Sequence, residues 1–173
     1  CWAFGTHPES AYGIGGRQSR PEPGNIYDHH AVEYVFPGGA RVASYCSHFR
    51  NTTHRVGERV VGTKGESGLG GDYRLWEGEG WRFDGKDRNP YVQEHVDLLN
   101  AITGKGEHWN EGRQVAESCM AAVLGRMSCY TGRQIKWDWA VKESKLKLGP
   151  ENMEAFGPYD PPPVAIPGKT KLI

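Results

Sequence analysis

Polar and aromatic side chains gather in one short stretch near the start of the sequence. They are Arg17, Gln18, Tyr27, Asp28, His29 and His30. Planar polar groups make paired hydrogen bonds to sugar hydroxyls, and aromatic rings cover the C–H faces of a sugar. Because Arg17 and Gln18 end one expected strand and the other four residues begin the next, a short loop can bring all six together. The pattern indicates a carbohydrate-binding site; a hydrogen-bonded strand edge at the surface is the structural alternative.

Within this stretch, Arg17 is the side chain expected to contact a substrate. It follows three nearby glycines that allow close backbone approach, and its guanidinium carries a fork of donors that suits a hydroxyl pair or a carboxylate. Only one of His29 and His30 can face the same site, because adjacent strand residues point to opposite faces. Arg50 and His54, after the following strand, are weaker candidates for the site.

Motifs for cofactors and metals are incomplete in this sequence. The run Gly13 to Gly16 has Gln18 where a dinucleotide fingerprint needs its last glycine, and no βαβ unit follows. The four cysteines form no CxxC pair, so we expect reduced structural thiols, and no zinc site at Cys46 and His48. We therefore predict no catalytic, cofactor-binding or metal-binding residue in this chain.

Composition excludes several classes of partner. Lys and Arg total 21, as do Asp and Glu, so no basic excess points to nucleic acid or an anionic membrane surface. No apolar run approaches the roughly 20 residues that span a bilayer. The 173 residues suit one globular domain that buries a core without disulfides. The chain opens at Cys1 instead of Met, so we expect a fragment or processed product, and cellular location is not indicated.

Secondary-structure signals place strands first and helices second. Strands are expected over residues 7–17, 55–63 with a partner after 65, 73–76 and 81–83. Two further strands, over 27–36 and 40–49, are expected to form a hairpin that turns at Pro37-Gly38-Gly39. In the strand over 27–36, one face carries His30, Val32, Tyr34 and Phe36, and the other carries His29, Ala31, Glu33 and Val35. Helices are expected from the Asn89 cap to the Gly104 stop and from 116 to Gly132, before a short extended segment.

This order predicts an α+β fold with a mostly antiparallel, open-faced β-sheet backed by helices. We expect residues 1–147 to form a single domain for substrate binding and oligomerisation. Residues 148–173, rich in Pro and Gly, are expected to form an irregular C-terminal arm. That arm is interpreted as lying on the domain's own surface or on a partner's, with a disordered end as the alternative.

Five segments in this order resemble the C-terminal domain of Gfo/Idh/MocA-type oxidoreductases. They are GIGGRQ at 13–18, YDHHAVEYVFPGGARV at 27–42, ERVVGTKGESG at 58–68, NPYVQEHVDLLNAI at 89–102 and GRMSCYTGRQIKWDWA at 125–140. The closing KLKLGP, PPPV and Pro167 resemble the end of bacterial members of that family. The resemblance spans essentially the whole chain.

The resemblance implies a partner domain and a reaction. Members pair this open-faced domain with an N-terminal Rossmann domain that binds NAD or NADP, and they transfer hydride between the nicotinamide and a hydroxyl-bearing carbon of a sugar or cyclitol. The family's catalytic Lys belongs to the Rossmann half, and its Asp-x-x-x-His pair has no counterpart placed here. The implied role is therefore the substrate-binding and oligomerisation domain of an NAD(P)-dependent sugar dehydrogenase, non-catalytic by itself. An NAD-dependent glycosidase relative and a stand-alone carbohydrate-binding module are the alternatives.

Partners follow from the same expectations. The strands over 27–36 and 40–49 carry apolar residues on both faces, and helices on one side cover only one of them. An uncovered apolar sheet face predicts a homo-oligomer formed through the sheet, or cover by the Rossmann domain of the same protein. The other expected partner is a small sugar-like substrate, with neither nucleic acid nor membrane.

Overall fold

The computed structural model describes residues 1–68, 72–75, 77–82, 84–86, 88–149, 157 and 160–173. These residues form two compact units, one made of Cys1–Arg50 with Asn110–Ile173 and the other of Asn51–Trp109. The strands accordingly fall into two four-stranded sheets, whereas the sequence predicted one sheet. The boundary predicted at residue 147 between a domain and an arm stays a prediction.

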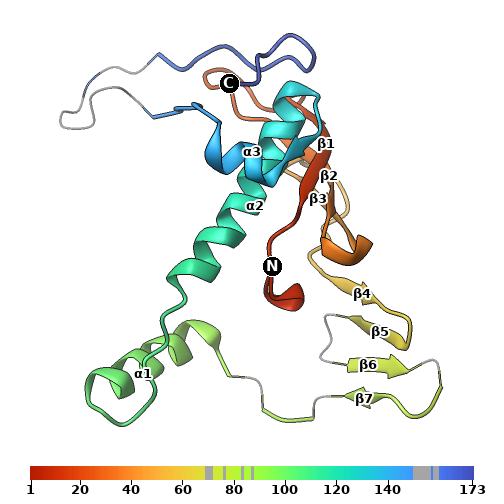
Figure 1. The fold of residues 1–173 in the computed structure, drawn as a ribbon, viewed down its shortest axis with the longest axis vertical. Helices are drawn as coiled ribbons and strands as arrows, with labels where there is room; N and C mark the ends of the chain where they lie inside the picture. Colours follow the sequence, from red (N-terminus) through yellow and green to blue (C-terminus); the bar gives the residue numbers. More distant parts are fainter. Residues whose placement is uncertain (69–71, 76, 83, 87, 150–156, 158–159) are drawn as a thin grey trace. The chain divides into compact units, whose positions relative to one another are not determined.

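The first unit is built on an antiparallel sheet with the strand order β3-β2-β1-β8 (Figure 1). Its strands are β1 (Ser10–Gly16), β2 (His29–Val35), β3 (Arg41–Ser47) and β8 (Ile135–Lys136). The β2–β3 hairpin turns through the 3-10 segment η2 (Pro37–Gly39), and Phe36 N–H donates to the Ala40 carbonyl at 2.8 Å. Gly38 takes a φ of 79°, which glycine adopts without strain. The predicted hairpin is confirmed.

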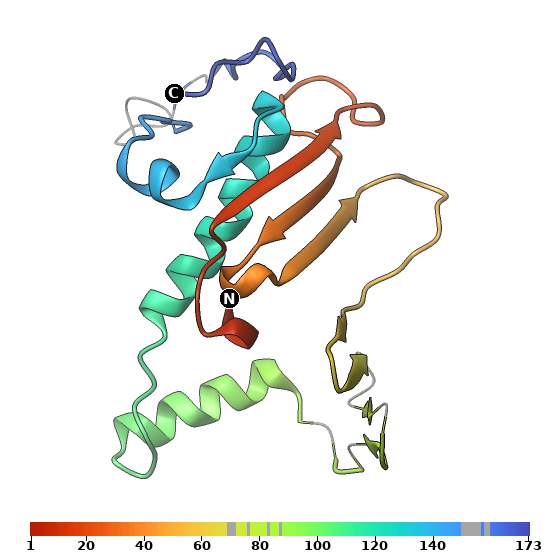
Figure 2. The same cartoon turned by 45° about the vertical axis from the view of Figure 1, so that its right-hand side comes forward.

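Helix α2 (Gly112–Thr131) runs along one face of this sheet (Figure 2). It ends where the sequence predicts, at Gly132 with a φ of 71°, and its buried residues all lie between Leu124 and Thr131. Glycines allow the close approach of helix and sheet. A Cβ on Gly13 would lie 2.6 Å from Cys129 Sγ, and one on Gly125 would lie 3.1 Å from Val32 Cγ1. Gly13 in β1 and Gly125 in α2 therefore serve helix–sheet packing.

Strand alternation separates a covered face from an open one. The covered face carries His30, Val32 and Tyr34 of β2, which lie toward α2 together with a core that includes Ala11, Leu124, Cys129 and Ile135. On the open face, Ile14, Ala31 and Tyr45 form one cross-strand row. Ile14 is 64% exposed and Tyr45 77% exposed. The predicted assignment of β2 residues to two faces is confirmed.

A short helix follows β8 that the sequence did not predict. This helix, α3 (Trp137–Lys142), has an acidic residue in its first turn and a basic one in its last, which complements the helix dipole. Six residues show too little of the helical period to be separated from a strand by sequence pattern. Trp137 is buried and its ring stacks on His7 with centroids 4.2 Å apart, so α3 is fixed to the segment that precedes β1.

Residues 160–173 contain no helix or strand and lie against the first unit. Asn25 Nδ2 donates to the Pro162 carbonyl at 2.9 Å, and the Tyr27 hydroxyl donates to the Ala165 carbonyl at 2.8 Å. Gly168 N–H donates to the Thr131 carbonyl at 2.9 Å. The described part of the predicted arm therefore lies on the surface of its own chain.

The second unit contains a small antiparallel sheet and one helix. The strands are β4 (Arg59–Val61), β5 (Gly65–Gly68), β6 (Asp72–Leu75) and β7 (Trp81–Arg82), in the order β4-β5-β6-β7. Helix α1 (Pro90–Ile102) starts at Asn89, whose Oδ1 accepts from Tyr91 N–H at 3.0 Å, as predicted. Trp76 and Phe83, the predicted strand ends, lie outside the described residues. A further 3-10 turn, η1 (Trp2–Phe4), opens the first unit.

Across the described ranges, no helix combines the length and the apolar character that crossing a bilayer requires.

Candidate functional site

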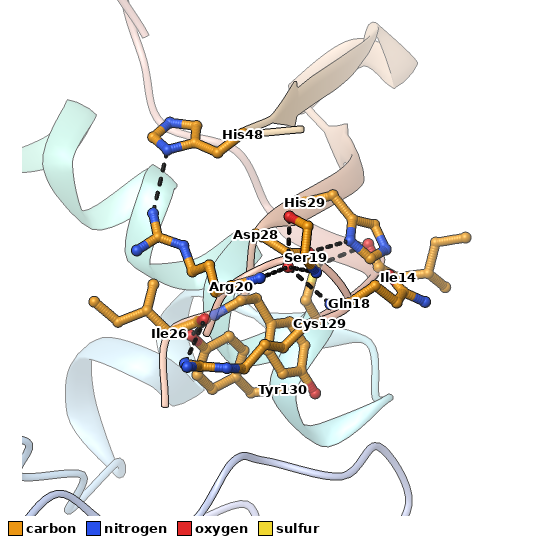
Figure 3. Close-up of polar contacts among 12 residues, drawn as sticks. Ile14, Gln18, Ser19, Arg20, Ile26, Asp28, His29, His48, Cys129 and Tyr130 are labelled. Atoms are coloured by element: carbon orange, nitrogen blue, oxygen red, sulfur yellow. Dashed lines mark hydrogen bonds and ion pairs between the residues drawn. The ribbon is translucent and has the colours of Figure 1, made fainter. Parts of the chain in front are cut away.

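Asp28 organises the loop that joins β1 to β2. Its Oδ2 accepts hydrogen bonds from three consecutive backbone N–H groups, those of Gln18 at 2.7 Å, Ser19 at 2.6 Å and Arg20 at 3.1 Å (Figure 3). Its Oδ1 lies 2.8 Å from His29 Nδ1. The Asp28 side chain is fully buried. Both carboxylate oxygens are thus occupied by the chain itself, and a contact between Asp28 and a substrate stays a prediction.

The environment of Asp28 keeps it ionised. Burial by itself raises the pKa of this carboxyl, because it disfavours the charged form. The hydrogen bond to His29 and the backbone N–H groups of the loop outweigh burial, and together they hold the pKa of Asp28 well below its usual range. The loop geometry therefore depends on a carboxylate, with its negative charge, at this position.

Arg17 and Arg20 are engaged within the same loop. Arg17 Nη2 donates to the Pro21 carbonyl at 2.5 Å and its Nη1 donates to the Ile26 carbonyl at 3.4 Å. Arg20 Nη2 lies 3.2 Å from His48 Nδ1, which ties the loop to the residue after β3 (Figure 3). The Arg17 guanidinium thus spans its own loop in this structure, and the predicted contact with a substrate remains a prediction.

His29 and His30 lie on opposite faces of β2 and have different surroundings. His29 belongs to the open face, where Asp28 holds its Nδ1 and the Phe49 ring lies 5.3 Å away. His30 belongs to the covered face, with ring centroids 5.8 Å from Tyr27 and 6.1 Å from Tyr130. Burial, assisted by the charges of His29 and Arg126 and opposed by Asp28, lowers the pKa of His30. At neutral pH, His30 is therefore an uncharged imidazole.

Tyr27 and Tyr130 join the sheet to the helix beside His30. Tyr27 backbone N–H donates to the Tyr130 hydroxyl at 3.0 Å, and the two ring centroids are 4.1 Å apart. The Tyr27 hydroxyl donates in turn to Ala165, so both hydroxyls are used inside the protein. Burial raises the pKa of the Tyr27 hydroxyl, and the neighbouring Tyr130 raises it further. The two tyrosines are buried and connect the start of β2 to α2.

Arg126 completes this group on the covered face. Its guanidinium carbon lies 4.0 Å from the centre of the Tyr130 ring, a cation–π arrangement. We call Tyr27, His30, Arg126 and Tyr130 the aromatic cluster. Sequence reasoning did not single out Arg126, although its spacing of four from Tyr130 on a predicted helix places both on one helix face.

The six predicted site residues do come together at the loop-side ends of β1 and β2, but they divide into three groups. The first group, Arg17, Gln18 and Asp28, builds the loop through main-chain hydrogen bonds. Tyr27 and His30 belong to the aromatic cluster, and His29 lies on the open face. Arg50 ends the first unit and His54 lies in the second, so their part in this site stays a prediction.

Cofactor and metal ligands were considered for the same region. Gly13, Gly15 and Gly16 lie inside β1, an antiparallel strand, and not between a strand and a helix N-terminus, where a dinucleotide phosphate binds. These residues therefore do not fit a nicotinamide dinucleotide. Within the described ranges, no three side chains of His, Cys, Asp or Glu gather as metal ligands.

Comparisons with known proteins were made by sequence and by structure. No protein-family model matches the sequence, and no curated protein matches it. Several solved structures share its fold, among them the three that follow. A Thermotoga maritima protein assigned as an oxidoreductase superposes with a TM-score of 0.60 at 17% identity, covering 78% of this chain and 42% of its own.

The other two structures are also of oxidoreductases. The aldose-aldose oxidoreductase of Caulobacter crescentus, complexed with glycerol, gives a TM-score of 0.58 at 17% identity and covers 78% of this chain and 43% of its own. The WlbA dehydrogenase of Bordetella pertussis, in complex with NADH and UDP-GlcNAcA, gives a TM-score of 0.54 at 18% identity. The match covers 75% of this chain and 39% of the dehydrogenase chain. This chain spans less than half the length of each structure it matches. It shares an α+β fold with part of each of these three oxidoreductases, and an α+β fold is what its sequence predicted.

Proposed function

We propose that this chain is the substrate-binding and oligomerisation domain of an NAD(P)-dependent oxidoreductase that acts on a sugar or related polyol. A Rossmann domain elsewhere in the full-length protein binds NAD or NADP. Hydride passes between the nicotinamide and a hydroxyl-bearing carbon of the substrate. The chain itself contributes binding and orientation of the substrate, and it holds neither the dinucleotide nor the catalytic lysine.

One observation carries this proposal. Three oxidoreductases share the fold over three quarters or more of this chain, while the chain spans only about two fifths of each of them. One of the three is an aldose-aldose oxidoreductase, and another was solved with NADH and UDP-GlcNAcA. Gly13, the first glycine of the run, packs β1 against Cys129 of α2 in place of lining a phosphate site, which supports placing the cofactor on a separate domain.

The open face of the first unit supports the oligomerisation role. Ile14 and Tyr45 expose most of their side chains there, and Tyr12 is 52% exposed beside them. Apolar residues that are contiguous across three strands form the kind of surface that a second protein surface covers. In this proposal a second copy of the chain covers the face, with symmetry-related strands facing each other.

The full-length protein tests the proposed reaction. It is incubated with NAD or NADP and a panel of aldoses, cyclitols and sugar acids, and reduced nicotinamide is followed at 340 nm. We expect reduction of one of the two cofactors that depends on a member of the panel, with an oxidised sugar as product. Release of a free aglycone from a glycoside without net reduction of the cofactor would support the glycosidase alternative. Binding of sugars without either reaction would support a carbohydrate-binding module.

A further inference from the structure

Arg126 on α2 carries a positive charge that no carboxylate among the described residues neutralises. Its side chain is half-buried on α2, and its one recorded contact is the stack on the Tyr130 ring. Among the described residues, no carboxylate pairs with it and no carbonyl accepts from its N–H groups. A guanidinium has five donors in a planar fork, and stacking on a ring leaves all five in the plane available.

His30 stands beside Arg126 with its nitrogens equally unused. Its ring lies parallel to that of Tyr130 within 8°, with centroids 6.1 Å apart, and the Arg126 guanidinium carbon lies 4.0 Å from the centre of the same Tyr130 ring. In the part of the chain that the structure describes, neither ring nitrogen of His30 has a hydrogen-bond partner. As an uncharged imidazole, His30 supplies one N–H donor without adding a second positive charge.

The nearest carboxylate does not neutralise this pair. Asp28 adjoins His30 in sequence, but its oxygens are bound by three backbone N–H groups and by His29. The tyrosine hydroxyls are also used, one by the backbone of Tyr27 and the other by Ala165. Within the aromatic cluster, Arg126 and His30 therefore carry the unused hydrogen-bond donors, whereas Tyr27 and Tyr130 are buried, at 3% and 8% exposed.

We propose that Arg126 and His30 bind the anionic group of a sugar acid or sugar phosphate. Arg126 makes paired hydrogen bonds to two oxygens of the carboxylate or phosphate, and His30 donates one more. The inference deepens the proposed function by naming the substrate class, and it rests on that function only for the sugar. Carboxylate and phosphate share the recognition chemistry, and the test separates them.

Binding is measured by calorimetry on the full-length protein with three probes: sodium glucuronate, glucose 6-phosphate and neutral glucose. We expect one of the two anionic probes to bind at least about tenfold more tightly than glucose, because a charge-assisted bidentate pair contributes that much. Tighter glucuronate identifies a carboxylate site, and tighter glucose 6-phosphate a phosphate site. Equal affinity for all three probes would overturn the proposal.

Substitutions assign the effect to the cluster. Arg126→Gln is expected to weaken binding of the preferred anion about tenfold or more and to leave glucose binding unchanged. Arg113→Gln is the matched control, since it removes the same charge from an exposed position on the same helix. It is expected to bind like the wild type. Equal loss in both variants would reduce the effect to general charge and contradict the site.

Arg126→Lys keeps the test valid if the glutamine variant folds poorly. Lysine retains the charge but loses the planar fork, so we expect a loss between those of the wild type and Arg126→Gln. Wild-type affinity for the anion in a folded Arg126→Lys would contradict bidentate recognition. Failure of the anion site with continued turnover of neutral sugars would leave the proposed function intact. Anion binding that depends on Arg126 without any turnover would instead remove the proposed reaction.

Discussion

The two faces of the β1–β2–β3 sheet are made by alternate residues of the same strands, yet they differ in almost every physical property. On the covered face, Val32 is 6% exposed and Ala11 is fully buried, and glycines bring the sheet close to α2. On the open face, Tyr45 is 77% exposed. The covered face is packed against α2 in the same chain, whereas the open face leaves large side chains exposed. One strand thus contributes to a packed core on one face and to an exposed surface on the other.

The adjacent histidines show the same contrast at the level of one peptide unit. His30, on the covered face, has its pKa lowered by burial and lies beside Arg126 and two tyrosine rings. His29, on the open face, is held by a carboxylate. Positions that look equivalent in sequence therefore have opposite chemistry, because the strand period of two assigns them to different surroundings.

The largest loss of stability is expected from a substitution on the covered face, at Ser128. Its fully buried hydroxyl accepts from Gly13 N–H at 2.8 Å and donates to the Arg133 carbonyl at 2.6 Å. Ser128→Ala leaves the strand N–H without a partner, so the free energy of unfolding is expected to fall by about 1–3 kcal/mol. Urea unfolding followed by circular dichroism measures the change.

Ser118→Ala, at an exposed position of the same helix, is the matched control. Its hydroxyl donates to a helical carbonyl at 2.9 Å, and its removal is expected to change the free energy by under about 0.5 kcal/mol. If the two variants unfold at the same urea concentration, the helix–sheet contact does not hold the covered face together.

A smaller loss of stability is expected from a substitution of Asp28, which holds the loop between β1 and β2. Asp28→Asn replaces a carboxylate that accepts from three backbone N–H groups, and the melting temperature at pH 7 is expected to fall by on the order of 5 °C. Its folded pKa lies below the unfolded value of 3.8, so this stabilisation is present above pH 4 and is lost as the pH falls further. Thermal melts from pH 7 to pH 3 follow both changes.

The difference between wild type and Asp28→Asn should therefore shrink below pH 4. Asp138→Asn serves as the control, because Asp138 is exposed and forms only an i,i+4 pair with Lys142 at 3.5 Å. A melting-temperature difference for Asp28→Asn that stays constant down to pH 3 would show that the carboxylate charge does not organise the loop.

The smallest effect on stability is expected on the open face. Tyr45→Ser is predicted to change the free energy of unfolding by under about 0.5 kcal/mol, because the side chain is already exposed. The same substitution is expected to weaken self-association of the full-length protein, measured as a lower mass by light scattering at micromolar concentration. Tyr91→Ser on α1, also 77% exposed in its own unit, is the control. A wild-type protein that is monomeric throughout would contradict the role of the open face.

Local signals in the sequence predicted most of the elements. The Asn89 cap, the Gly132 stop and the turn at Pro37–Gly39 each fix a boundary through backbone chemistry that depends on a few neighbouring residues. Strand alternation also predicted that His29 and His30 face opposite ways. Helix α3 and the division into two units were not predicted, because short elements carry little periodicity and packing between strands depends on distant contacts.

The candidate site was predicted only in part for the same reason. Polar residues at strand ends are visible in the sequence, but the backbone geometry that occupies Asp28 is not. Tyr27 and Tyr130 are separated by more than a hundred residues, and their contact arises from the packing of α2 on the sheet. Arg126 becomes a candidate for the site only through its stacking on the Tyr130 ring, which the sequence does not reveal.

We propose that this chain holds the substrate side of an oxidoreductase and that the dinucleotide binds to another domain of the full-length protein. Titration of NAD and of NADP, followed by calorimetry, into residues 1–173 and into the full-length protein tests this claim directly. We expect one dinucleotide to bind the full-length protein with micromolar affinity and neither dinucleotide to bind residues 1–173. Stoichiometric binding at micromolar strength to residues 1–173 alone would contradict it.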